Sequence, residues 1–145
     1  MTDLMADASS TRWIPPGNDE EVAASYAAAY ASADLETLRG LLAPDVVSRL
    51  LMPGDFRTLH GADAFVEELA AAVSQVDAAR PHSSSVAVIG DKFVTRSRIV
   101  LEVDGSRFHL EHQEVVTVRD GYVVALDGVC TGFRPVAGNG SGVRR

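Results

Sequence analysis

Apolar residues near the start of the chain recur at helical spacing. Between about Asp19 and Ala31, residues three and four positions apart fall on one face, namely Val22, Tyr26, Ala29 and Tyr30. Asn18 is suited to cap the N-terminus of this segment, and Glu21 three positions later completes a capping-box-like pattern. The pattern predicts a first helix whose apolar face packs on the rest of the fold.

A short helix, a strand and a third helix are predicted next. Asp34 can cap a helix rich in leucine, and Pro44 is expected to end it. Asp45–Met52 has the pattern of a strand, and Pro53-Gly54 that of the turn that follows. The third helix is expected to start near Gly61. Its apolar face is predicted to consist of Phe65, Leu69, Val73 and Val76.

The chain after Pro81, which is expected to limit the third helix, is predicted to be β-structure. Four segments are separated by turn residues: Ser83–Ile89, Lys92–Val103, Arg107–Arg119 and Tyr122–Phe133. The turns are Gly90-Asp91, Asp104-Gly105 and Asp120-Gly121. Asp-Gly pairs between alternating segments are strong hairpin signals, so an antiparallel meander is expected. Helices followed by strands favour an α+β fold.

Length and composition fit a single domain. The chain has 145 residues, of which 46% are hydrophobic and 23% charged. Residues 18–135 are predicted to form one α+β pocket domain. Residues 1–17, with the paired Pro15-Pro16, are expected to form an N-terminal tail, and the glycine-rich residues 136–145 a flexible C-terminal tail.

Charge and residue content exclude several classes of partner and cofactor. The formal net charge is -7 and no basic stripe is present, which argues against a nucleic-acid partner. No apolar stretch is long enough for a membrane span, and no signal-peptide pattern occurs, so a cytoplasmic location is expected. Cys130 is the single cysteine, and His109 and His112 point to opposite faces of a strand. We therefore expect no metal site and no cofactor.

Two polar residues fall on an otherwise apolar strand face. In Arg107–Arg119, one alternating face is almost entirely polar, whereas the other is apolar except for His112 and Glu114. Carboxylates are rarely buried without a partner or a purpose. His112 and Glu114 are thus candidate site residues, although hydrogen bonding within the core, or a strand end open to solvent, would also explain them.

The face of the sheet on which Asp127 lies depends on the pairing register of the last two strands. A regular two-residue turn would place Asp127 opposite Glu114 on the inner face. A bulge, which Gly128 makes credible, would instead turn Asp127 outward and bring Leu126 and Cys130 inward. Asp127 is a candidate site residue under the first alternative and a solvated strand residue under the second.

Several phrases of the sequence resemble the nuclear transport factor 2-like superfamily. They are "YAAAYASADLETL" at Tyr26–Leu38, Pro44-Asp45 before a strand, His60-Gly61 before the third helix and "EVVTVRDGYVV" at Glu114–Val124. The resemblance covers about residues 19–134. It implies a cone-shaped α+β barrel, in which three N-terminal helices pack on a strongly curved, mostly antiparallel sheet. It also implies a homodimer.

The same resemblance suggests roles for individual residues. Tyr26 and Glu114 fall where ketosteroid isomerases place a tyrosine and a protonated acid that donate to a developing oxyanion. The general base of those enzymes is an aspartate before a Pro-Gly pair, and this chain has Met52 there. In the SnoaL-like polyketide cyclases, Glu114 corresponds to a histidine and Gly128 to a catalytic aspartate.

These observations predict a cofactor-independent acid–base enzyme, similar to an isomerase or a cyclase, that acts on an apolar carbonyl or polyketide-type compound. Tyr26 and Glu114 would polarise the carbonyl, and His112 or Asp127 would move the proton. The sequence resembles small members of the superfamily from antibiotic (enediyne or polyketide) biosynthetic clusters. The alternatives are a non-catalytic protein that binds the same kind of small molecule, and a dimerising interaction domain.

Overall fold

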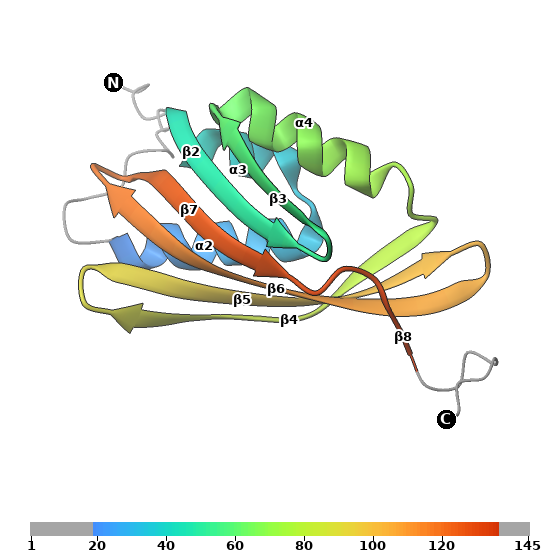
Figure 1. The fold of residues 1–145 in the computed structure, drawn as a ribbon. Coiled ribbons are helices and arrows are strands. Elements are labelled where there is room, and N and C mark those ends of the chain that lie inside the picture. Colours follow the sequence, from blue (N-terminus) through green and yellow to red (C-terminus); the bar gives the residue numbers. More distant parts are fainter. Residues whose placement is uncertain (1–18, 137–145) are drawn as a thin grey trace, which may run out of the picture.

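The computed structural model describes residues 19–136 and contains three helices within that range (Figure 1). They are α2 (Asp19–Ser32), α3 (Leu35–Leu41) and α4 (Ala62–Val73). All three predicted helices are present, within a few residues of the expected ends. The predicted cap Asn18, the tail 1–17 and nearly all of the tail 136–145 lie outside the described residues.

The strands form one strongly curved sheet. They are β2 (Leu42–Met52), β3 (Asp55–His60), β4 (Ala78–Ile89), β5 (Lys92–Val103), β6 (Ser106–Arg119), β7 (Tyr122–Cys130) and β8 (Arg134–Pro135). The strand order is β3-β2-β7-β6-β5-β4, and β8 pairs with β6. Within the described residues only β2 and β7 pair in parallel. The fold is therefore α+β and cone-like, but the sheet stays open because β3 and β4 are edges.

The start of β2 differs from the sequence prediction. Asp34 caps α3 as expected, since its side chain accepts a hydrogen bond from the backbone N–H of Thr37 at 3.2 Å. The helix ends before Pro44, because Leu42 is already extended with φ −88° and ψ 138°. Pro44 lies within β2, where the pairing with β7 is interrupted between Leu42 and Val47. A proline is tolerated at such an irregularity because no regular ladder hydrogen bond is lost there.

Two stretches of strand were not predicted. Asp55–His60 forms the edge strand β3, and β4 begins at Ala78 instead of Ser83. Both edge strands are mostly exposed and so lack the alternation that identifies a half-buried strand. Pro81 lies within β4 next to a register shift, which an edge strand accommodates.

The helices cover the inner face of the sheet. The helix α2 packs against β4, β5 and β6, and α4 packs against β2 and β3 (Figure 1). The predicted strand faces are confirmed, because alternate residues of β5 and β6 are buried, with His112 and Glu114 among them. The largest fully buried side chains include Tyr26, Leu38 and Leu126. The inner face of β6 is thus placed directly beneath α2.

Candidate functional site

A cavity of about 310 Å³ lies between the helices and the inner face of the sheet. Most of its wall is aliphatic or aromatic and comes from α4 and from strands β2, β5 and β6. The polar side chains among the lining residues are those of Tyr30, Ser48, Glu68, His112 and Cys130. This is the composition of a small-molecule site, in which a few polar groups orient an apolar ligand.

Three buried side chains and the half-buried side chain of Tyr30 form a connected polar network beside this cavity. The hydroxyl of Tyr26 donates to Glu114 Oε1 at 2.5 Å. The other carboxylate oxygen of Glu114 lies 3.0 Å from His112 Nε2. The hydroxyl of Tyr30 lies 3.2 Å from His112 Nδ1. The two aromatic rings of Tyr30 and His112 are stacked, with centroids 4.3 Å apart.

Regular secondary structure brings these four residues together. Tyr26 and Tyr30 are one helical turn apart on α2, and His112 and Glu114 are two apart on β6, so each pair shares a face. Gly128 is the partner of Glu114 on β7. A Cβ atom at Gly128 would lie 2.5 Å from Glu114 Cγ, so glycine is required there for the carboxylate to keep its position.

Burial and the Glu114 carboxylate set the charge of this network. Burial by itself lowers the pKa of His112, but the Glu114 charge and the interactions with Cys130 and Glu114 together outweigh burial and raise the pKa to about 9. Burial and the Glu114 charge also hold the pKa values of Tyr26 and Tyr30 well above their usual value. At neutral pH the network therefore contains an imidazolium that can donate a hydrogen bond.

The family assignment follows from the sequence as a whole. The family model of the SnoaL-like domain matches residues 22–126, which is well over half of the chain. The chain belongs to the SnoaL-like domain family. This agrees with the resemblance to the nuclear transport factor 2-like superfamily and with the architecture of three helices on a curved sheet. No curated protein gives a significant match.

Solved structures with the same fold include candidate polyketide cyclases. IdmH from Streptomyces antibioticus, a candidate polyketide cyclase, has a TM-score of 0.62 and 22% identity, covering 77% of this chain and 90% of its own. A candidate polyketide cyclase from Xanthomonas campestris has a TM-score of 0.62 and 17% identity, covering 76% and 87%. A hypothetical protein from Catenulispora acidiphila with a ketosteroid isomerase-like fold has a TM-score of 0.64 and 14% identity, covering 84% and 94%. At these identities the likeness shows the fold.

Only two of the four network residues in this SnoaL-like domain border the cavity, and the other two lie behind them. His112 and Tyr30 line the cavity. Tyr26 and Glu114 are 1% and 2% exposed and sit against His112 outside the lining. Of the four residues, His112 and Tyr30 are therefore the ones whose side chains border the cavity, and Tyr26 and Glu114 lie behind them.

Asp127 lies on the outer face of the sheet. Its carboxylate pairs with Arg49 Nε at 2.6 Å, and its partner on β6 is Val115, not Glu114. The cause is a bulge at Val124, where β7 carries one more residue than β6 between two paired positions. The outward alternative is correct, with Leu126 and Cys130 buried as it required. Asp127 is thus outside the arrangement that can contact a ligand.

Several residues of the cavity wall were not predicted as site residues. Tyr30 was expected only on the apolar face of the first helix, and its four-residue spacing from Tyr26 was the available signal. Cys130, which the bulged alternative turns inward, lines the cavity and is the partner of His112 on β7. Ser48 and Glu68 carried no signal, because their placement depends on the curvature of β2 and the position of α4.

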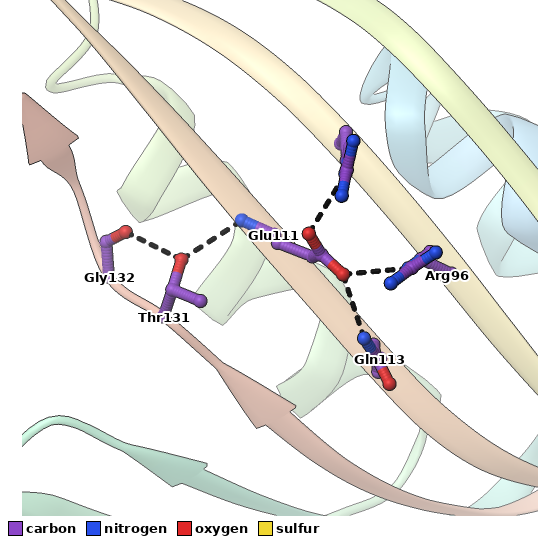
Figure 2. Close-up of polar contacts among 6 residues, drawn as sticks. Arg96, Glu111, Gln113, Thr131 and Gly132 are labelled. Carbon is purple, nitrogen blue, oxygen red and sulfur yellow. Dashed lines mark hydrogen bonds and ion pairs between the residues drawn. The ribbon is translucent and has the colours of Figure 1, made fainter. Parts of the chain in front are cut away.

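A second polar cluster anchors β6 from its outer face (Figure 2). Glu111 accepts hydrogen bonds from Arg96, Arg98 and Gln113. Its backbone N–H donates to Thr131 Oγ1 at 2.9 Å, so the end of β7 is fastened to β6 beside His112. These contacts fix the two strands at the level of the site.

Residues 19–136 contain neither a metal-binding cluster nor a membrane-spanning helix. In this part of the chain no group of three or more His, Cys, Asp or Glu side chains is arranged to hold a metal ion. No helix in it has the length and apolar content that a bilayer crossing requires.

Proposed function

We propose that this protein is a cofactor-independent acid–base enzyme of the isomerase or cyclase type. Its substrate would be an apolar carbonyl or polyketide-type small molecule in natural-product biosynthesis. The observation that carries the proposal is the His112 imidazole at the wall of an apolar cavity, backed by the buried carboxylate of Glu114. The fold shared with candidate polyketide cyclases and the sequence resemblance to proteins of antibiotic clusters support it.

The proposed chemistry starts at the carbonyl oxygen of the substrate. Protonated His112 donates to this oxygen and, with the Tyr30 hydroxyl beside it, stabilises the negative charge that develops as an enol forms. Glu114 keeps the imidazole protonated and oriented, and Tyr26 holds Glu114 in place. The apolar wall excludes water, which strengthens each of these electrostatic interactions.

Removal of a proton from carbon needs a second group. Met52 lines the cavity where the resemblance to ketosteroid isomerases implies an aspartate base, and a thioether cannot accept that proton. The carboxylate among the lining residues is that of Glu68, which is ion-paired with Arg57. In this proposal Glu68 accepts the proton from the carbon next to the carbonyl.

The second candidate function is binding without catalysis. Met52 favours it, because the wall is otherwise apolar at the place where the isomerase base is expected. A protein of this kind would hold the same ligand through the same His112 contact and leave its carbon–hydrogen bonds intact.

Hydrogen–deuterium exchange of a probe ketone separates the two functions. We suggest 2-tetralone in D₂O, followed by mass spectrometry, with binding measured separately by calorimetry. The enzyme proposal predicts exchange next to the carbonyl at about 10²–10⁴ times the rate in buffer, lost in His112→Gln. Asp127→Asn is the matched control on the outer face and should keep the full rate. Binding with no acceleration would reject catalysis in favour of the binding function.

A further inference from the structure

Ser48 is a buried polar residue of the cavity wall to which the acid–base mechanism gives no role. It is 2% exposed and faces inward on β2 between the apolar Val46 and Leu50, which share its face. Its partners on the neighbouring strands are Leu59 on β3 and Leu126 on β7. Neither of these side chains can form a hydrogen bond, so the Ser48 hydroxyl lies in aliphatic surroundings.

The Ser48 hydroxyl has no hydrogen-bond partner within residues 19–136. It is also not sealed off by protein atoms, because the fully enclosed side-chain atom without an aligned hydrogen bond in this range is His112 Nε2. Since Ser48 borders the cavity, its hydroxyl opens onto that space. A hydroxyl taken from water without a new partner costs free energy. A polar group of a bound ligand would supply the missing hydrogen bond.

Ser48 and His112 lie well apart on the inner face of the sheet. Ser48 pairs with Leu126, Leu126 pairs with Val116, and Val116 is four residues from His112 along β6. With strands about 4.8 Å apart and a rise of about 3.3 Å per residue, the two Cα atoms are separated by about 16 Å along the sheet. Because the serine side chain is short, a ligand that contacts both residues needs two separate polar groups.

We propose that Ser48 is a specificity-determining residue that contacts the ligand, and that the ligand carries a second oxygen group away from the carbonyl that His112 contacts. A serine hydroxyl both donates and accepts, so a hydroxyl or a second carbonyl of the ligand fits it. The ligand class is thus an apolar compound with oxygen groups at two places, and not a simple ketone. The inference rests on the proposed function for the position of the first carbonyl. It concerns recognition, so it applies to a binding protein as well as to an enzyme.

The test compares 2-tetralone with 6-hydroxy-2-tetralone, which carries a hydroxyl on the ring remote from the carbonyl. Dissociation constants of both compounds are measured by calorimetry for the wild type, Ser48→Ala and Ser97→Ala. Ser97 is the matched control, because it is also a buried serine on the inner face but lies outside the cavity wall. Its hydroxyl already donates to the Ala27 carbonyl oxygen at 3.3 Å.

We expect the wild type to bind the hydroxylated ketone about tenfold more tightly than 2-tetralone, which corresponds to one hydrogen bond of about 1.4 kcal/mol. In Ser48→Ala this preference should disappear, because the ligand hydroxyl would then be buried without a partner. Ser97→Ala should keep the preference. A wild type that does not bind the hydroxylated ketone or shows no preference for it overturns the proposal, and so does a preference that Ser48→Ala retains.

Two further measurements separate this inference from a structural role of Ser48 and from the proposed function. Ser48→Ala should unfold at a urea concentration no lower than the wild type, and a lowered midpoint would show that the hydroxyl is a structural partner and overturn the proposal. The deuterium exchange described above reports on catalysis alone. A preference lost in Ser48→Ala without accelerated exchange supports this inference and rejects the enzyme, whereas accelerated exchange without the preference rejects this inference and keeps the enzyme.

Discussion

His112 and Glu114 are ionisable side chains buried in an apolar setting. Their side chains are 3% and 1% exposed, and the two form an ion pair with each other. Removing two charges from water is costly, and an ion pair in such a place stabilises a protein little compared with well-packed apolar residues. Removing one partner alone strongly destabilises a protein, because the remaining charge stays buried without an opposite charge beside it. The retention of the pair is therefore more easily explained by function than by stability.

Replacing Glu114 by Leu should destabilise the protein by about 3–5 kcal/mol, because His112 and the Tyr26 hydroxyl lose their partner. The double variant Glu114→Leu with His112→Leu should recover most of this loss. Urea denaturation of the wild type, both single variants and the double variant measures the coupling. Additive effects would show that the two side chains do not form the pair described.

The stability of the protein should depend on pH through His112. Its pKa in the folded protein is about 9, above the ordinary 6.5, so the folded state binds the proton more tightly than the unfolded state. The resulting stabilisation, about 3 kcal/mol, is fully present below pH 6.5 and is lost as pH rises through about 9.

Free energies of unfolding of the wild type and His112→Gln across this pH range test this. The difference between them should shrink as pH rises from 6.5 to about 9. A difference that stays constant over the range would mean that His112 is not charged in the folded protein.

At the scale of elements, alternation predicted the site strand β6 correctly. His112 and Glu114 were placed on the inner face because every second residue from Phe108 to Val118 is apolar except these two. Alternation could not decide which face of the sheet Asp127 lies on. The answer depends on one extra residue, Val124, which has no partner on β6, and the order of polar and apolar residues in β7 does not reveal this bulge. The positions of Tyr30 and Cys130 in the cavity wall were not predicted, because they depend on how α2 and β7 meet β6 in space.

Gly128 connects the bulged strand to the site. Alanine there would place its Cβ 2.5 Å from Glu114 Cγ and 3.1 Å from the Gln113 carbonyl oxygen. We expect Gly128→Ala to cost about 1–3 kcal/mol through overpacking and to displace the Glu114 carboxylate from His112. Val88→Ala, at an exposed position of the edge strand β4, is the control and should change stability little. Thermal unfolding measures both, and equal effects would contradict the close approach.

At the scale of the whole molecule, the outer face of the sheet combines charge with apolar surface. Hydrogen bonds from Gln113 and from the two arginines Arg98 and Arg96 lower the pKa of Glu111 to about 2, so this cluster stays charged (Figure 2). Val129 nearby is 53% exposed. Valines among opposite charges suit a self-complementary two-fold contact.

We predict a homodimer through this face, which also carries Val94, Val100 and Val115. Val115→Glu, which introduces a charge at a partly exposed position of the face, should give a monomer, whereas Glu36→Gln on the helical side should not. Light scattering at micromolar concentration measures the mass. A monomeric wild type would contradict the prediction.

The central claim is that His112 polarises a carbonyl group bound in the apolar cavity. The ¹³C chemical shift of 2-tetralone labelled at its carbonyl carbon tests it most directly, because this shift moves downfield when the oxygen accepts a strong hydrogen bond. We predict a downfield shift on binding to the wild type that is lost in His112→Gln and kept in Asp127→Asn. A bound ketone whose carbonyl resonance is the same in the wild type and in His112→Gln would contradict the account.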